Sequence, residues 1–256
     1  MKIRRKLPKP ARARQPAYVI GYSSAGPTFS DLRDWFDLEY GGPLKLSTGT
    51  LRHTPGGDRP APVLAVHGPW SAALHLSIPQ EETDVWREGL GWGHRAAAEV
   101  VPTNARPREA SDQVLHAARL ARGLTLLTDG TAYDTACQIF LNPSDWKDRP
   151  LDQFKVGDHL TIEQTEAADS DHEWFLTRGL AKFGLDEIET LRPIGLSSRP
   201  VLEILAALAD ELVRIGQSPK VGTTLVVPAL VLPVEFIRHR TVARGVVPTS
   251  VREVKW

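Results

Sequence analysis

Hydrophobic positions repeat with helical spacing in three segments of the chain. The first, residues 29–40, is followed by Gly41-Gly42-Pro43, which ends a helix. A second helix is predicted over residues 108–122. The third is predicted over residues 200–215, with Gly216 as its C-terminal cap. Its apolar stripe consists of Val201, Ile204, Leu205, Leu208, Leu212 and Ile215.

Between the helices, short β-prone segments are bounded by turn residues. Residues 154–165 place Leu160 and Ile162 on one face and Thr161 and Glu163 on the other, which is typical of a half-buried strand. By the same reasoning, strands are predicted over residues 17–22, 44–53, 63–67, 72–78, 95–101, 124–127, 133–141, 172–176 and 221–227.

The order of these elements predicts the fold class. Strands outnumber helices and do not alternate regularly with them, which argues against a doubly wound parallel sheet. We expect an α+β fold with a mainly antiparallel sheet and helices packed on one face. No linker interrupts residues 17–227, so one domain is predicted there. Residues 228–256 contain three prolines and are expected to form an irregular extension that can add an edge strand.

Composition narrows the class of protein. Hydrophobic residues make up 41% of the chain and charged residues 24%, as in ordinary globular proteins. The single cysteine, Cys137, excludes an internal disulfide. The histidines lack metal-binding spacing, so we expect neither a metal nor a cofactor. No apolar run reaches the roughly 18 residues of a membrane span, and no secretory signal is recognised. These features predict a cytoplasmic protein.

The N-terminal residues 1–16 are predicted to form a flexible basic arm. Residues 1–15 contain no acid, and three prolines within residues 1–16 disfavour a helix. Such an arm can be a solvated leader, or it can bind nucleic acid through its cationic side chains. Those side chains are Lys2, Arg4, Arg5, Lys6, Lys9, Arg12 and Arg14.

The most distinctive segment runs from Trp174 to Glu189. It combines aromatic residues, two glycines, Arg178 and three carboxylates within sixteen residues. It resembles a signature of uncharacterised bacterial domain families, in which a Trp is followed by Thr-His-Gly-Leu, a Gly and a Glu-apolar-Glu triplet. Here Glu187-Ile188-Glu189 is the triplet, and Arg178 stands in the position of the histidine. The resemblance covers about residues 70–227 and implies an α+β architecture without an assigned activity.

Polar residues of this segment are the candidates for catalysis. His172, Arg178, Glu187 and Glu189 would be close together if the strand through Trp174 paired with the strand through Ile188. Paired carboxylates can serve as general acid and base, which suggests a hydrolase. The same residues can instead form a structural salt-bridge network. We favour that interpretation and predict that Arg178 contacts Asp186, Glu187 or Glu189.

A second candidate site precedes the first helix. Gly21-Tyr22-Ser23-Ser24-Ala25 follows a strand and leads into a helix, which is the setting of a nucleophile elbow. An ordinary turn explains the same residues. Alternatively, Ser23, Ser24 and Gly26 can bind an anion at the helix N-terminus.

Two tryptophans and Arg178 are candidates for binding a partner. Trp174 lies in the signature segment together with Arg178, and Trp256 is the last residue. The leading hypothesis is a non-enzymatic binding or protein-interaction module in a bacterial accessory system. The alternatives are a hydrolase using carboxylates near Trp174 and nucleic-acid association through the basic arm.

Overall fold

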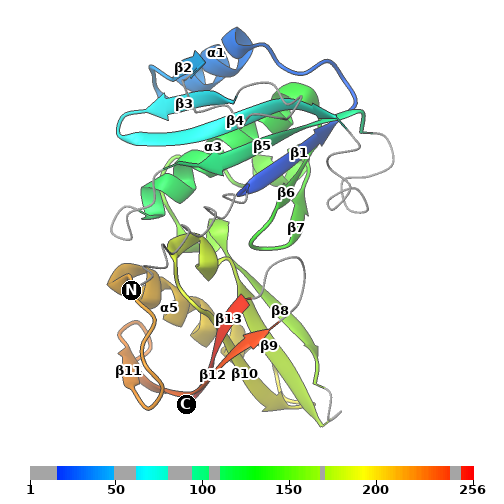
Figure 1. Cartoon of the computed structure of the whole chain (residues 1–256). Coiled ribbons are helices and arrows are strands. Elements are labelled where there is room, and N and C mark those ends of the chain that lie inside the picture. Colours follow the sequence, from blue (N-terminus) through cyan, green and yellow to red (C-terminus); the bar gives the residue numbers. More distant parts are fainter. Residues whose placement is uncertain (1–15, 49–61, 80–93, 104–109, 168–170, 243–248) are drawn as a thin grey trace, which may run out of the picture.

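The computed structural model describes residues 16–48, 62–79, 94–103, 110–167, 171–242 and 249–256. The basic arm and its predicted contact with nucleic acid lie outside the described residues, apart from Pro16. Within the described part, the chain forms two β-sheets that follow one another along the molecule (Figure 1). We call them sheet A, from the first half of the chain, and sheet B, from the second half.

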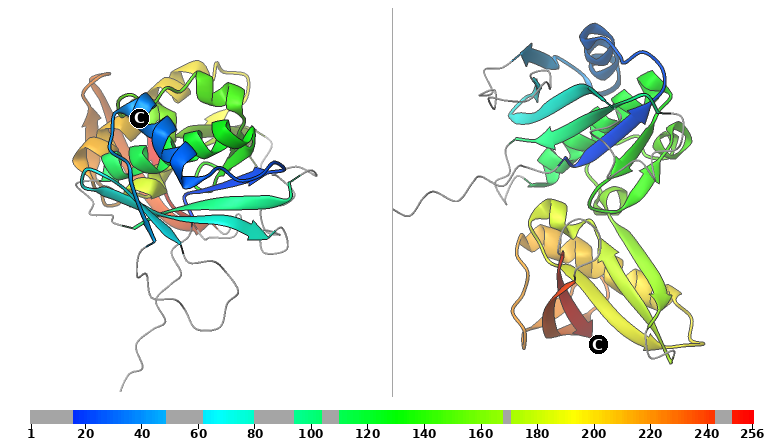
Figure 2. Two further views of the ribbon diagram at one scale, coloured as in Figure 1. Left: turned by 90° about the horizontal axis from the view of Figure 1, so that it is seen from above. Right: turned by 45° about the vertical axis from the view of Figure 1, so that its right-hand side comes forward.

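Sheet A has seven strands in the order β2-β3-β4-β5-β1-β6-β7, and all neighbouring strands are antiparallel. The helices α1 and α3 cover one face of the sheet (Figure 2). The elements are β1 (Tyr18–Tyr22), α1 (Phe29–Tyr40), β2 (Lys45–Thr48), β3 (Val63–His67), β4 (Trp70–Pro79), β5 (Ala96–Pro102), α3 (Ala110–Thr128), β6 (Thr131–Asp134), β7 (Ile139–Leu141) and α4 (Pro143–Lys147).

Helix α3 is longer than the sequence predicts. The strand expected over residues 124–127 is wrong, because the helix continues to Thr128. Gly123 lies inside this extension, and a Cβ atom there would come within 2.5 Å of the Trp35 ring. The glycine therefore lets α1 approach α3 closely. Leu124 points into the core and is 1% exposed, so tertiary packing outweighs its local preference.

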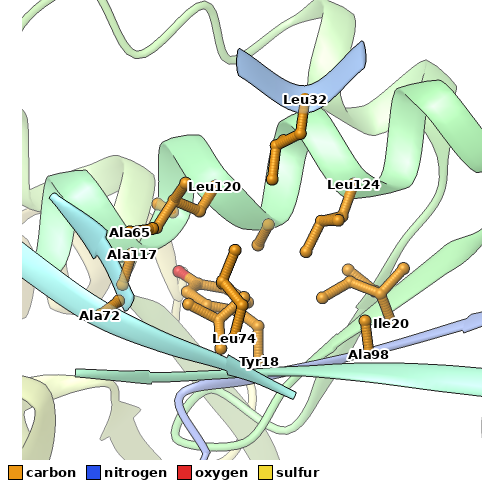
Figure 3. Close-up of a cluster of buried hydrophobic side chains, with 14 of the residues drawn as sticks. Tyr18, Ile20, Leu32, Ala65, Ala72, Leu74, Ala98, Ala117, Leu120 and Leu124 are labelled. Carbon is orange, nitrogen blue, oxygen red and sulfur yellow. The ribbon is translucent and has the colours of Figure 1, made fainter. Parts of the chain in front are cut away.

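The core of sheet A lies between its strands and these two helices (Figure 3). Tyr18 and Ile20 of β1 belong to one buried cluster with Leu74 of β4 and with Leu120 and Leu124 of α3. Because β1 lies inside the sheet between β5 and β6, its side chains reach the centre of this cluster.

Sheet B has six strands in the order β11-β12-β13-β10-β9-β8. Its neighbours are antiparallel except β10 and β13, which are parallel. Its elements are η3 (Val156–His159), β8 (Thr161–Glu166), β9 (His172–Arg178), η4 (Leu180–Phe183), β10 (Glu187–Pro193), α5 (Arg199–Ile215), β11 (Thr224–Val227), β12 (Leu232–Val242) and β13 (Thr249–Lys255), where η marks a 3-10 turn.

The irregular extension predicted for residues 228–256 is wrong. Strands β12 and β13 form there, and β13 lies inside the sheet between β12 and β10 rather than at an edge. Pro228 and Pro233 do not prevent this, because Pro228 lies in the β11–β12 turn and Pro233 near the start of β12.

Helix α5 packs on sheet B with the apolar stripe that the sequence predicts. Its residues Leu205 and Leu208 are 0% exposed and cluster with Phe175 of β9, Ile188 of β10 and Phe236 of β12. The predicted α+β class with mainly antiparallel sheets is confirmed. No helix in the described part of the chain is long and apolar enough to cross a membrane.

The buried face of α5 gives a stability prediction. Replacing Leu205 with alanine should lower the free energy of unfolding by about 2–5 kcal/mol, because it leaves a cavity in a closed core. Urea unfolding of the wild type and the variant measures this loss. Leu202→Ala on the same helix, where the side chain is only partly buried, is the control and should cost less. Equal midpoints for wild type and Leu205→Ala would contradict the packing described here.

Candidate functional site

The signature segment forms β9, the turn η4 and β10. The predicted pairing of the strands through Trp174 and Ile188 is confirmed, with Glu189 opposite Leu176 and Leu191 opposite Trp174. The chain reverses between Gly179 and Gly184, with η4 as the connecting turn. The segment therefore has the hairpin-like shape that its glycines suggest.

Glu187 holds this reversal together. Its Oε1 atom accepts hydrogen bonds from the main-chain N–H groups of Gly179 and Ala181, at 2.9 and 3.1 Å. Its Oε2 atom accepts one from the Thr177 hydroxyl at 2.8 Å, and Thr177 in turn accepts one from the N–H of Ile188. Burial raises the pKa of Glu187, and the hydrogen bonds from Ala181, Thr177 and Gly179 act in the opposite direction. Both carboxylate oxygens of Glu187 thus accept hydrogen bonds, Oε1 from the turn and Oε2 from strand β9.

Gly179 is required by close approach as well as by conformation. Its φ angle is +120°, which side-chain-bearing residues rarely adopt. A Cβ atom there would lie 2.3 Å from the carbonyl oxygen of His159 and 2.9 Å from the sulfur of Cys137. The glycine therefore allows the turn after β9 to pack directly against η3 and against the β6–β7 connection of sheet A.

Glu189 is the centre of a second group of contacts. The indole N–H of Trp174 donates to Oε2 of Glu189 at 2.8 Å. The guanidinium of Arg240 on β12 donates to both carboxylate oxygens, with Nε at 2.7 Å from Oε1. The Arg240 guanidinium also lies 6.0 Å from the centroid of the Trp174 ring. The hydrogen bond with Glu189 raises the pKa of Arg240. Trp174, expected to bind a partner, is instead 8% exposed and joined to its own sheet.

Arg178 does not form the predicted pair with Asp186, Glu187 or Glu189. Its guanidinium binds Glu163 on β8, with Nη2 at 2.7 Å and Nε at 2.8 Å from Oε2. The pairing of β8 with β9 sets Thr161 opposite Arg178 and Glu163 opposite Leu176, which brings Glu163 within diagonal reach.

Asp186 also has an arginine partner, but a different one. Its carboxylate accepts a hydrogen bond from Nε of Arg252 on β13 at 2.7 Å. Burial alone would raise the pKa of Asp186, and the bonds from Arg252 and Ser250 lower it. The sequence suggested Asp186 and Glu189 as partners of Arg178. They instead bind arginines of the C-terminal strands.

The candidate catalytic residues do not form one constellation. His172 begins β9 and Arg178 ends it, so at about 3.3 Å per residue their Cα atoms lie roughly 20 Å apart. Acid–base partners act within hydrogen-bond distance or through one water. Glu187 and Glu189 are each 2% exposed and occupied by the contacts above. The polar side chains of the segment therefore hold strands of sheet B together.

The turn of this segment also carries a buried link to sheet A. The ammonium of Lys182 in η4 lies 2.5 Å from Oδ2 of Asp134 at the end of β6, and both side chains are at most 5% exposed. Lys182 also donates to the carbonyl oxygen of His159 at 3.0 Å and contacts the sulfur of Cys137 at 3.3 Å. Burial alone would lower the pKa of Lys182, but attraction to Asp134 outweighs it and raises the pKa well above its ordinary value.

The groups around this ion pair are held in their neutral forms. Burial, reinforced by the Asp134 charge, raises the pKa of Cys137 to about 12 and also raises that of Tyr18. Burial and the Lys182 charge lower the pKa of His159 to about 3. The His159 ring stacks on Phe154 with centroids 5.3 Å apart. A protonated thiol and a neutral imidazole suit a packed junction better than a nucleophilic site.

Sequence reasoning missed Lys182 and Asp134. Lys182 lies within the signature segment, so its position could have marked it as a candidate residue. The sequence places Asp134 inside one strand predicted over residues 133–141, whereas in the structure it ends β6 and precedes a turn, where an aspartate is ordinary. Only the contact between two distant turns reveals the pair.

The residues of the expected anion site, Ser23, Ser24 and Gly26, do not cap the helix that follows them. Helix α1 begins later, and its cap is Thr28, whose side chain accepts from the N–H of Asp31 while the Asp31 carboxylate accepts from the N–H of Thr28. The Thr28 bonds lower the pKa of Asp31. A negative charge thus already occupies the helix N-terminus. The Ser24 hydroxyl donates to the carbonyl of Thr128 at 3.1 Å.

The buried ion pair gives the second prediction. Lys182→Met should lower the free energy of unfolding by about 3–5 kcal/mol, because it leaves Asp134 buried without its counter-charge. Lys182→Met combined with Asp134→Asn should regain a large part of this loss. Arg199→Met, which removes an exposed i,i+4 pair with Glu203, should leave the unfolding midpoint unchanged.

Calorimetry of the wild type tests the single domain predicted for residues 17–227. A single domain requires one cooperative unfolding transition.

The buried His159 gives a pH prediction. Its folded pKa is about 3, below the ordinary value near 6.5, so between these values the unfolded chain binds the proton and the folded chain does not. Its contribution to stability is therefore fully present above pH 6.5 and is lost as the pH falls, by ~1.4 kcal/mol per pH unit. Urea unfolding at pH 7 and pH 5 should show a smaller loss for His159→Phe than for the wild type. An equal loss in both proteins would refute this assignment.

Among the described residues, no group of three or more histidine, cysteine, aspartate or glutamate side chains is arranged to hold a metal ion. No protein-family model, curated protein or solved structure matches the chain. The resemblance carried by the Trp174–Glu189 segment therefore stays a prediction, and the function has to be argued from the geometry.

Proposed function

We propose that this chain is a non-enzymatic binding module that docks a protein partner through one end of sheet B. The supporting observation is an accumulation of exposed apolar side chains at the end of the sheet that lies away from the Lys182–Asp134 contact. We call this surface the distal patch. It consists of Leu191, Ile194, Leu196, Leu230, Val231 and Trp256, each more than 40% exposed.

The strand register brings these residues to the same end of the sheet. Lys255 of β13 pairs with Glu235 near the start of β12, so Trp256 lies at the end of the sheet where the β11–β12 turn carries Leu230 and Val231. Strand β10 runs parallel to β13, with Glu189 beside Glu253, so its continuation through Leu191 reaches that end as well. Segments distant in sequence thus bring exposed apolar side chains to the same end of the sheet.

Val231 is the most unusual member of the distal patch. Its φ angle is 51°, a left-handed conformation that is rare for a β-branched residue and costs backbone energy. Its side chain is 82% exposed, so folding gains little from burying it. Glycine or asparagine would satisfy this turn at lower cost. A valine held outward under strain is better explained by contact with a partner.

Exposed apolar surface supports a protein partner in particular. Contiguous exposed apolar patches on soluble proteins commonly mark interaction sites, and a partly exposed tryptophan is a frequent centre of binding energy. No residue from 221 to 234 carries a charge. This leaves the turn side of the patch without the cationic groups that an anionic surface would attract.

The hydrolase alternative has weaker support. Catalysis by the carboxylates near Trp174 requires at least one of them to meet a substrate, yet Glu187 and Glu189 are buried and accept hydrogen bonds from their own chain. Arg178 is 8% exposed and paired with Glu163. These residues serve stability better than chemistry.

Site-specific cross-linking tests the proposal. A photoreactive phenylalanine analogue at position 196 should capture a protein partner in extract of the native cell, whereas the same analogue at position 38 should not. Leu38 is a matched control because it is 87% exposed on α1. The same analogue is then placed at a third position. Leu196→Asp combined with Trp256→Asp should abolish capture of the same protein from that position, and Leu38→Asp should leave the capture intact. Equal capture by both variants would exclude the distal patch as the docking surface.

A further inference from the structure

We propose that strand β11 pairs antiparallel with β11 of a second copy of this chain, joining two B sheets across a two-fold axis. The inference goes beyond the docking of a different protein at the distal patch, because it concerns the long edge of sheet B. Strand β11 is the last strand on this side of the sheet, so its outer main-chain groups have no neighbouring strand in the described structure.

The hydrogen bonds of β11 show which residues face outward. Phe236 bonds toward the β11 side, donating to the carbonyl of Thr223 at 3.0 Å and accepting from Gly222 at 2.7 Å. In an antiparallel pair this direction alternates along the strand. Leu225 and Val227, which lie opposite Val234 and Leu232, therefore bond inward to β12. Thr224 and Val226 direct their N–H and C=O groups away from the sheet.

The edge is also compatible with its own copy. A two-fold axis brings each side chain near an identical segment, so a charged edge would repel itself. No residue from 221 to 234 is charged. The opposite edge of sheet B, strand β8, contains Glu163 and Glu166 and is protected from self-pairing in the usual way. Strand β11 has no such protection, and its Thr-Leu-Val-Val sequence favours extended structure.

One register satisfies the outward groups of both copies. With Leu225 opposite Leu225 of the second copy, Thr224 and Val226 of each chain exchange main-chain hydrogen bonds with Val226 and Thr224 of the other. Shifting the register so that Val226 faces itself places Pro228, which has no N–H, opposite Thr224. Shifting it so that Thr224 faces itself requires the N–H of Gly222, which already bonds Phe236.

This register also explains the partial exposure of Leu225. Its side chain is only partly buried and packs at the margin of the sheet B core. A second Leu225 across the axis would extend that core and cover both side chains. Because β11 has four residues, the contact area is small, and a weak dimer that depends on concentration is expected.

Sedimentation velocity over a concentration series tests self-association. The wild type should shift from monomer to dimer as its concentration rises. Val226→Pro removes an outward donor without removing a bond to β12, and Val226→Lys sets two lysines near the axis. Each variant should weaken the dimer by about tenfold or more. Glu166→Lys on β8 is the control and should sediment as the wild type does. A wild type that stays monomeric, or a dimer unchanged by both Val226 variants, would overturn the proposal.

Cysteine substitution tests the register independently. Leu225→Cys places two thiols across a pair whose Cα atoms are expected about 4.5 Å apart, within the range for a disulfide. Mild oxidation should give a linked dimer of Leu225→Cys and much less of Val226→Cys, while the native Cys137 is buried and should not contribute. Preferential linkage through position 226 would overturn the register. Val226→Lys should leave cross-linking from position 196 intact, so failure of the dimer is distinguishable from failure of the distal patch.

Discussion

The ion pair between Lys182 and Asp134 is the central charged contact between the two sheets, and beside it Ala110 and Val114 of α3 pack into the core of sheet B. Both charges are nearly removed from water, so neither is tolerable without the other. Lys182 lies in the turn between β9 and β10, and Asp134 ends β6 of sheet A. The pair therefore fixes that turn against sheet A and, through the two strands that leave it, positions sheet B. The close approach at Gly179 then follows from the same geometry.

The dense chemistry of the signature segment has a structural explanation in this setting. A turn buried between two sheets exposes several N–H groups to a region without water, and each needs an acceptor. Glu187 accepts hydrogen bonds from two of these N–H groups, those of Gly179 and Ala181, through its Oε1 atom. Glu189 joins Trp174 to a strand that arrives much later in the chain. Charged residues gathered in a short segment can thus be requirements of packing, even where they resemble a catalytic set.

Local signals predicted local features well, and long-range contacts account for the remainder. The helices over 29–40 and 200–215 were located closely because Gly41 and Gly216 mark their ends within the sequence itself. The extension of α3 depends on Trp35 of another helix, which no local window contains. The partner of Arg178 was missed because it depends on the pairing of β8 with β9, and the central place of β13 depends on β10. The α+β class survives such errors, because it depends on the number and order of elements rather than on their partners.

The position of β13 has a consequence for the order of folding during synthesis. The described strands of sheet A all lie between residues 18 and 141, so that sheet can assemble while the rest of the chain is still being made. Sheet B cannot, because its inner strand β13 is translated after the other five. Until it arrives, β10 has an open edge next to a partly formed core. Pairing between strands so distant in sequence is slow. The nascent C-terminal half therefore passes through an interval in which it is vulnerable to misassembly and proteolysis, and in which binding by a chaperone would help it.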